Sequence, residues 1–350
     1  MALTRISAKY PPQIDPTRTP LAFGARAIPR LNKELQNDTL LTRQRAVMSL
    51  CDHLHDPEHI ATALREGIAE SLKKLLCDPD ITVRQKSTEC LFVIAGHAIG
   101  RDAFLDHEII KPVSNLFNDS EDIARKNAHK ALEMISETPQ GAEGIVACEL
   151  VPTLVEKLKT ELDEIKELIL DTLHYCMRVD TSKALASDAM KTFTSLLKHE
   201  IPVIRSKAAR DIMDLSIPLA GKDKAVEEEA VPELINLLND ESADVIANAA
   251  GAIMTISITT KGKYTSIGGN AVEPLVKLVN HSTSEVRVNA LKALTCLSEA
   301  PEGREVLLLH VDSVKQKCSL KILTCLPIFL VLGPHFCNNV LTYIRHLLGQ

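Results

Sequence analysis

Hydrophobic and polar residues alternate in a two-helix pattern within residues 230–257, AVPELINLLNDESADVIANAAGAIMTIS. Apolar residues first form a stripe that ends at Leu238, and the polar pair Asn239 and Asp240 follows it. Ser242 then offers a side chain of the type that caps helices. Beyond it, apolar residues return at spacings of three and four, the period of one helix face. The segment predicts two amphipathic helices, each of which needs a neighbour to cover its apolar face.

The same pattern recurs along the chain with an almost constant period. With Leu238 as the marker, successive markers are 41, 41, 41, 39, 41 and 41 residues apart: Leu35, Leu76, Phe117, Leu158, Leu197, Leu238 and Val279. A mostly small residue in the second helix repeats with the same steps: Ala46, Ser87, Ala128, Ile169, Ala208, Ala249 and Ala290. Two independent positions therefore indicate one repeat.

Helical repeats of about 40 to 47 residues are typical of armadillo and HEAT units. We predict an all-α fold, an armadillo/HEAT-like right-handed superhelical solenoid of about seven repeats. A linking helix is expected before each marker, for example at 66–72 and 222–230. In the fourth copy, Lys157 and Ile169 replace the usual leucine and small residue, so a local difference in geometry is expected there.

The repeats are expected to occupy residues 27–310, with a different segment on each side. Residues 1–26 are predicted to form an extended arm, because proline restricts the backbone and opposes helix formation. The arm lacks the apolar core of a signal peptide. Its prolines are Pro11, Pro12, Pro16 and Pro20.

Residues 311–350 do not continue the repeat, although an eighth marker would fall at Leu320. The apolar run 325–332 contains Pro327 and is far shorter than the roughly 20 residues of a membrane span. Two interpretations are open for this tail. It caps the end of the solenoid, or it is an atypical C-terminus from a variant transcript.

The charge and the cysteine content limit which functions and compartments fit this chain. The chain has 40 basic and 46 acidic residues, a net charge of −6, so it lacks the basic footprint expected of a nucleic-acid-binding protein. Its nine cysteines are odd in number and never form a C-x-x-C pair. This usage favours reduced thiols and a cytosolic compartment.

Motifs for catalysis or cofactor binding are absent from the sequence. Neither G-x-S-x-G nor H-E-x-x-H occurs, so we predict no enzyme activity, no cofactor and no small-molecule substrate. Gly262, Gly268 and Gly269 resemble a phosphate loop superficially. Because no strand precedes them and no GK[ST] follows, they are expected to form a flexible connection between repeats.

The strongest metal-like cluster is His53, His55 and His59 with Asp52. It falls where a long helix is expected to end, and imidazoles at such a position also suit the negative end of the helix dipole. We therefore predict no metal site.

The long helices are expected to line a concave groove, in which side chains four residues apart share one face. In the importin-α family two such rows carry Trp and Asn, which grip an extended basic peptide. Here the chain has no tryptophan, and the first row varies in charge along the axis. The predicted partner-binding residues are the charged members of that row: Glu89, Lys130, Asp171, Arg210 and Lys292. The second row is equally variable: Asp52, Val93, Met134, Tyr175, Asp214, Thr255 and Cys296.

A more specific resemblance is carried by the run PPQIDPTRTPLAFGARAIPRLNKELQNDTLLTRQRAV and by the repeats that follow, which end in NALKALTCLSEAPEGRE. Together they resemble the radial spoke head 14 family, the armadillo-repeat proteins of ciliary and flagellar radial spokes. The resemblance covers residues 1 to about 310 and excludes the tail.

The resemblance implies a structural role in the axoneme, with other radial spoke proteins as partners. It also implies a location in the cytoskeleton of the cilium or flagellum. Periodicity and composition by themselves support a non-enzymatic interaction scaffold. A soluble adaptor or transport receptor that binds peptides in its groove is the alternative.

Overall fold

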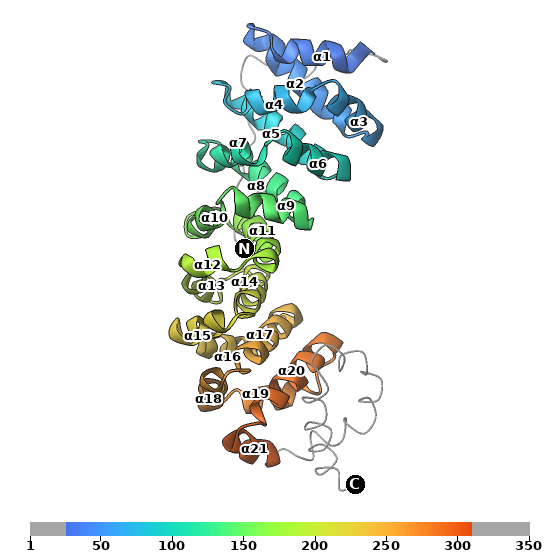
Figure 1. Ribbon diagram of the computed structural model, residues 1–350. Coiled ribbons are helices and arrows are strands. Elements are labelled where there is room, and N and C mark those ends of the chain that lie inside the picture. Colours follow the sequence, from blue (N-terminus) through green and yellow to red (C-terminus); the bar gives the residue numbers. More distant parts are fainter. Residues whose placement is uncertain (1–25, 310–350) are drawn as a thin grey trace. The chain divides into compact units, whose positions relative to one another are not determined.

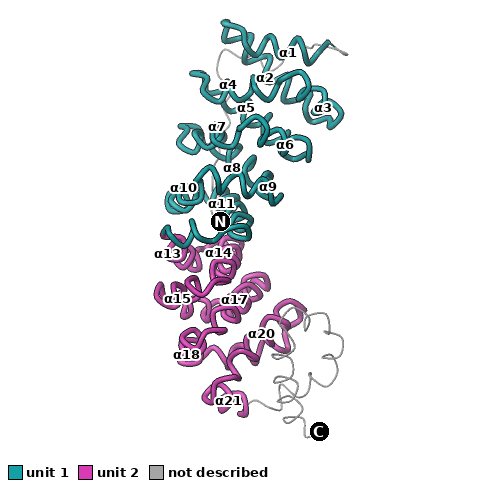
Figure 2. Tube along the Cα trace, viewed as in Figure 1, with its two compact units in different colours: residues 1–187 teal, residues 188–350 magenta. Residues whose placement is uncertain are grey.

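The computed structural model describes residues 26–309, and all the regular elements in this range are helices (Figure 1). The predicted tail at 311–350, and the predicted arm apart from Arg26, lie outside the described residues. The chain divides into two compact units, residues 1–187 and 188–350 (Figure 2), and each is described by itself. Among residues 26–309, no helix combines the length and the apolar character that crossing a membrane requires.

The first unit contains short helices that alternate with long ones. Its helices are α1 (Ala27–Leu35), α2 (Leu40–Leu54), α3 (Pro57–Arg65), α4 (Ile68–Leu75), α5 (Ile81–Ala95), α6 (Ala98–Asp106), α7 (Ile110–Ser114), the 3₁₀ turn η2 (Asn115–Asn118), α8 (Asp122–Ser136), α9 (Pro139–Ala147), α10 (Val151–Lys157), α11 (Asp163–Val179) and α12 (Ser182–Ala186).

The second unit follows the same alternation. Its helices are α13 (Ala189–Leu196), α14 (Pro202–Leu215), α15 (Leu219–Glu227), α16 (Ala230–Leu237), α17 (Ala243–Ile256), α18 (Thr260–Gly268), α19 (Val272–Leu278), α20 (Ser284–Leu297) and α21 (Pro301–Leu308).

The long helices pack against one another in succession within each unit, α2 to α5 to α8 to α11 in the first and α14 to α17 to α20 in the second. All seven marker residues are buried, including Leu76 and Leu238, each of which is 2% exposed. The mostly small residues that repeat in the long helices are buried as well, from Ala46 to Ala290. The predicted register and the all-α repeat fold are therefore confirmed.

The helix boundaries differ from the prediction at the linking segments. The helix expected at 66–72 is interrupted by Gly67, whose φ of 76° is left-handed, so that α4 begins at Ile68. The helix expected at 222–230 instead ends at Glu227, before Glu229, which is also left-handed (φ 55°). Each repeat thus has three helices, and a left-handed residue separates the first short helix from the second in most of them.

Ser242 occupies the N-cap position of α17 as predicted, but its side chain makes no capping hydrogen bond. Instead its backbone N–H donates to Asp240 Oδ1 at 2.9 Å, which fixes the turn between α16 and α17. The Asp240 carboxylate therefore holds the turn before α17, while the N–H groups of the first turn of α17 receive no side-chain cap.

A glycine in the first turn of a short helix recurs with the period of the repeat. A Cβ atom at this position would overlap the carbonyl oxygen of the residue six positions earlier, at the end of the long helix. Glycine therefore allows the two helices to meet closely. The glycines are Gly100, Gly141, Gly221, Gly262 and Gly303.

The expectation that Gly262, Gly268 and Gly269 form a flexible connection is wrong. Gly262 and Gly268 both lie within α18, and Gly269 is its C-cap. Gly262 is a packing residue, because its added Cβ would overlap the Ile256 carbonyl oxygen. The sequence signal that was missed is its spacing of 41 residues from Gly221.

The fourth repeat departs from the others, as its sequence predicted. Its long helix α11 has 17 residues, and the short helix α12 that follows has five. Ser182 occupies the position of the packing glycine, and its backbone N–H donates to Asp180 Oδ1 at 2.8 Å. Without the glycine, the short helix begins later and ends sooner.

Two glycines of α18 provide a matched test of the close approach. Gly262→Ala is expected to lower the free energy of unfolding by about 1 to 3 kcal/mol, because the methyl group is forced against backbone atoms. Gly268→Ala should instead raise it by up to about 1 kcal/mol, since no atom lies within 4 Å of the added Cβ and alanine is the better helix former. Urea denaturation followed by circular dichroism measures both. Equal effects of the two substitutions would contradict the packing role of Gly262.

Candidate functional site

The five predicted partner-binding residues occupy one position in the long helices, and all are half-buried. In the first unit, α5, α8 and α11 carry Glu89, Lys130 and Asp171. In the second unit, α14 and α20 carry Arg210 and Lys292. Half-buried charges of this kind are restrained by their neighbours, and the contacts they make decide how much each can offer a partner.

In the first unit these charges already have contacts within the chain. Glu89 Oε2 accepts a hydrogen bond from Lys86 Nζ at 2.7 Å on the same helix. The ammonium group of Lys130 lies 4.3 Å from the centre of the Phe92 ring, in a cation–π arrangement between neighbouring long helices. Asp171 also has an interaction partner. A partner protein must therefore compete with these contacts or extend them.

In the second unit Arg210 is a counterion. Its guanidinium donates to Asp211 Oδ1 at 3.0 Å, and the Asp211 side chain is completely buried. A buried carboxylate is costly unless it is paired and hydrogen-bonded. Arg210 therefore contributes to the stability of α14, which the sequence did not indicate.

Asparagines of the long helices are used to join neighbouring repeats. Asn248 donates to the backbone oxygen of Ser206 at 3.2 Å, and Asn289 donates to that of Ala247 at 2.9 Å. Within the first unit, Asn127 makes the equivalent contact to a carbonyl 42 residues earlier. These amides bind the chain's own backbone, whereas the asparagines of an importin-α-type groove would bind that of a peptide.

Arginine–carboxylate pairs form a second periodic feature, which the sequence analysis did not identify. Each pair joins the turn before one long helix to the equivalent turn in the next repeat. Each arginine donates to a carboxylate 35 or 36 residues later and to carbonyl oxygens of its own turn. The carboxylate side chains are 4 to 8% exposed. The pairs are Arg43–Asp78 at 2.8 Å, Arg84–Asp119 at 2.6 Å, Arg125–Glu161 at 3.1 Å and Arg205–Asp240 at 2.8 Å.

The electrostatics of one pair show how the series holds its charges. Burial by itself would raise the pKa of Asp119, but hydrogen bonds from Arg84 and from the Glu121 N–H hold that pKa below its ordinary value. The hydrogen bond to Asp119 correspondingly raises the pKa of Arg84. Both side chains therefore remain charged, and the pair fixes the spacing of neighbouring repeats.

The predicted histidine cluster is divided between two sets of contacts. His53 and His59 stack, with ring centroids 3.7 Å apart and planes 6° from parallel, and His59 Nδ1 lies 3.0 Å from the His53 carbonyl oxygen. Burial, followed by the neighbouring His59, lowers the pKa of His53. A lowered pKa favours the neutral imidazole, so His53 is a packing residue rather than a cation at the end of α2. His55 lies apart from the stack, close to Cys51 and Glu89.

The stacked three-helix repeats and the paired turns define an armadillo/HEAT-type helical repeat protein, a class whose members are typically binding scaffolds. The family model of the adaptin N terminal region matches residues 27–326. The chain belongs to this family.

Solved structures support the same fold. A crystal structure of an engineered protein from the Northeast Structural Genomics Consortium is similar with a TM-score of 0.77 and 23% identity, over 85% of this chain and 74% of that one. A designed armadillo repeat protein, solved in complex with the peptide (KR)4, is similar with a TM-score of 0.61 and 22% identity, over 65% of this chain and 98% of that one. At these identities the likeness concerns the fold alone.

Proposed function

We propose that this protein is a non-enzymatic structural scaffold of the axonemal radial spoke, where it holds neighbouring spoke subunits and supports ciliary or flagellar motility. The observation that carries this proposal is the resemblance of residues 1 to about 310 to the radial spoke head 14 family. The helical repeat fold supports the general role of a protein-binding scaffold. The ciliary location rests on the resemblance.

The side chains of the long helices favour folded or helical partners over one extended peptide. A receptor for extended peptides obtains affinity from similar contacts repeated along its axis, and here the equivalent positions change from Glu89 to Lys130 and from Gly251 to Lys292 within the two units. Partners would use a few buried anchors, with the half-buried charges setting their orientation.

Extraction from cilia tests the proposal against the alternative. A structural subunit should remain with demembranated axonemes and leave them only in high salt or chaotrope. A soluble adaptor or transport receptor that binds peptides in its groove should appear in the first wash with other soluble proteins. Release of the full chain in that first wash would overturn the structural proposal.

A charge reversal on α20 tests whether the groove residues contact a partner. Lys292→Glu is expected to reduce incorporation into spokes lacking the protein by about tenfold or more, because like charges brought together at an interface cost several kcal/mol. Arg210 is less suitable, since its reversal would remove a positive charge that pairs with the buried Asp211 carboxylate and would place a negative charge beside it. Incorporation is measured by adding each purified variant to axonemes that lack the protein.

The matched control is Lys277→Glu on the neighbouring helix α19, where the lysine side chain is 73% exposed. This variant should incorporate normally. Normal incorporation of Lys292→Glu as well would place the interface away from this row of the long helices.

A further inference from the structure

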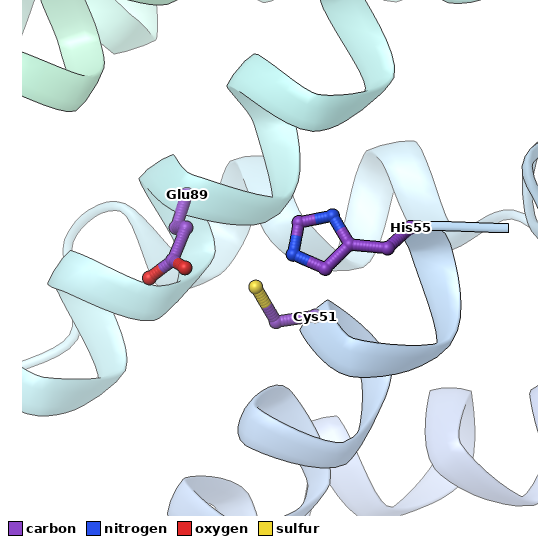
Figure 3. Close-up of side chains that lie close together, drawn as sticks. All are labelled: Cys51, His55 and Glu89. Carbon is purple, nitrogen blue, oxygen red and sulfur yellow. The ribbon is translucent and has the colours of Figure 1, made fainter.

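Three side chains of different chemistry converge where the first repeat meets the second. Cys51 lies on α2, His55 is the residue that ends that helix, and Glu89 lies on α5. The Cys51 sulfur, an imidazole nitrogen of His55 and a carboxylate oxygen of Glu89 all lie within 4.8 Å of one another. Figure 3 shows the three side chains directed toward a common space between the two helices.

We propose that Cys51, His55 and Glu89 form a binding site for a divalent metal ion of the zinc class. Sulfur, imidazole nitrogen and carboxylate oxygen are the ligands that zinc uses in proteins. Calcium and magnesium prefer oxygen ligands, and this set offers a thiol and an imidazole instead. Three protein ligands leave the fourth tetrahedral position for water or for a side chain of a partner.

The three ligand atoms must move slightly closer together to bind the ion. Zinc–ligand distances of about 2.0 to 2.3 Å place tetrahedral ligand atoms roughly 3.5 Å apart. His55 is exposed and Glu89 is half-buried, so both side chains have room to move toward the ion, while Cys51 is buried, at 1% exposure. The fixed sulfur therefore supplies the anchor of the site.

Neighbouring groups leave these three ligands able to bind. Lys86 hydrogen-bonds Oε2 of Glu89, which uses one of the two carboxylate oxygens. The adjacent thiol of Cys90 is completely buried and contacts the Val47 carbonyl oxygen at 3.7 Å.

The repeat itself does not require these residue types. At the position of Cys51 the next two repeats carry Phe92 and Glu133, and at that of His55 they carry Gly96 and Glu137. Cysteine, histidine and glutamate are therefore brought together at this junction without being needed for the stacking of α2 on α5. This independence favours binding over packing as the reason for the cluster.

Cobalt(II) provides the test, because a thiolate ligand gives it a charge-transfer band and a tetrahedral site intensifies its visible bands. The full metal-free chain is titrated with Co²⁺ under a non-chelating reductant, and Zn²⁺ is then added to displace it. We expect a thiolate band that saturates at one ion per chain and is abolished in Cys51→Ser. Since loss of even an outer-shell partner costs about 10- to 100-fold in affinity, His55→Ala and Glu89→Gln should each weaken binding at least tenfold.

Matched controls lie close in the sequence. Cys77→Ser removes an exposed thiol and His53→Ala removes a neighbouring imidazole, and both variants should bind as the unmodified chain does. If circular dichroism shows that the buried Cys51→Ser variant does not fold, the exposed His55→Ala variant provides the test instead. Its second measurement is the melting temperature, which Zn²⁺ should raise in the unmodified chain and leave unchanged in this variant. The absence of a thiolate band, or a band equally sensitive to Cys77→Ser, would overturn the proposal.

Discussion

Replacing Leu238 with alanine is expected to lower the free energy of unfolding by about 2 to 5 kcal/mol, the range found for leucine-to-alanine changes in closely packed cores. Leu238 is 2% exposed at the end of α16, where helices of the same repeat meet. The surrounding main chain is held by helix contacts on several sides, so the cavity can collapse only partly. Leu76→Ala should have an effect of similar size in the first unit, since Leu76 is equally buried.

Leu219→Ala is the matched control, because it removes the same atoms from a side chain that is 64% exposed. Its effect should stay within about 0.5 kcal/mol. The chain has no tryptophan, so urea denaturation is best followed by far-ultraviolet circular dichroism. If Leu238→Ala were as mild as Leu219→Ala, the register of the repeats would be wrong.

The fold could be predicted because the same pattern of apolar and small residues recurs along the chain. One segment with helical periodicity is ambiguous, but markers and small residues that keep the same steps over seven copies identify a stacked arrangement. The difference in the fourth repeat could be predicted as well, because Lys157 and Ile169 replace the leucine and the small residue that the other copies carry. The burial of the markers and the unusual lengths of α11 and α12 agree with this interpretation.

Helix boundaries were harder, since hydrophobic periodicity continues across a left-handed residue. Glu229 is a residue type that favours helix, yet its φ of 55° separates α15 from α16. The local sequence does not reveal this conformation. Gly262 was misinterpreted for a related reason, because its role depends on a carbonyl group at the end of the previous helix.

For the candidate sites, the sequence predicted which residues occupy equivalent positions in the repeats, but it did not predict their side-chain contacts. Periodicity placed Glu89 and Lys130 at equivalent points, but their contacts with Lys86 and Phe92 depend on side-chain conformation. The arginine–carboxylate pairs have a sequence signal, since an arginine recurs in the first turn of several long helices. Its partner, however, lies 35 or 36 residues later in the chain. Such a distant pair can be predicted to be in contact only after the period of the repeat has been recognised.

The first unit should also lose stability in mild acid through His129. This residue of α8 is completely buried and stacks on Phe117, with ring centroids 4.0 Å apart, and neither of its ring nitrogens has a hydrogen-bond partner among the described residues. Burial, followed by the positive charges of Lys157 and Arg125, lowers its pKa to about 3. The imidazole is therefore neutral in the folded protein at every pH above that value.

The sign of the effect follows from the two states of His129. In the unfolded chain the imidazole takes up a proton near its ordinary pKa of 6.5, whereas the folded protein excludes that proton until about pH 3. Between these values the unfolded state binds more protons, so the free energy of unfolding falls as the pH is lowered. Each pH unit below 6.5 costs about 1.4 kcal/mol, which amounts to about 2 to 3 kcal/mol at pH 4.5.

His129→Phe keeps a flat ring against Phe117 and removes the proton uptake. Carboxylates such as Asp119 also titrate in acid, but they are common to both chains, so the difference in unfolding free energy isolates the imidazole. We expect that difference to shift in favour of the variant by about 2 to 3 kcal/mol between pH 6.5 and 4.5, as measured by urea denaturation at each pH. Leu132→Ala, a buried change on the same helix without a titrating group, should lower stability equally at every pH. Parallel pH profiles for the unmodified chain and His129→Phe would show that the imidazole is accessible to protons in the folded protein.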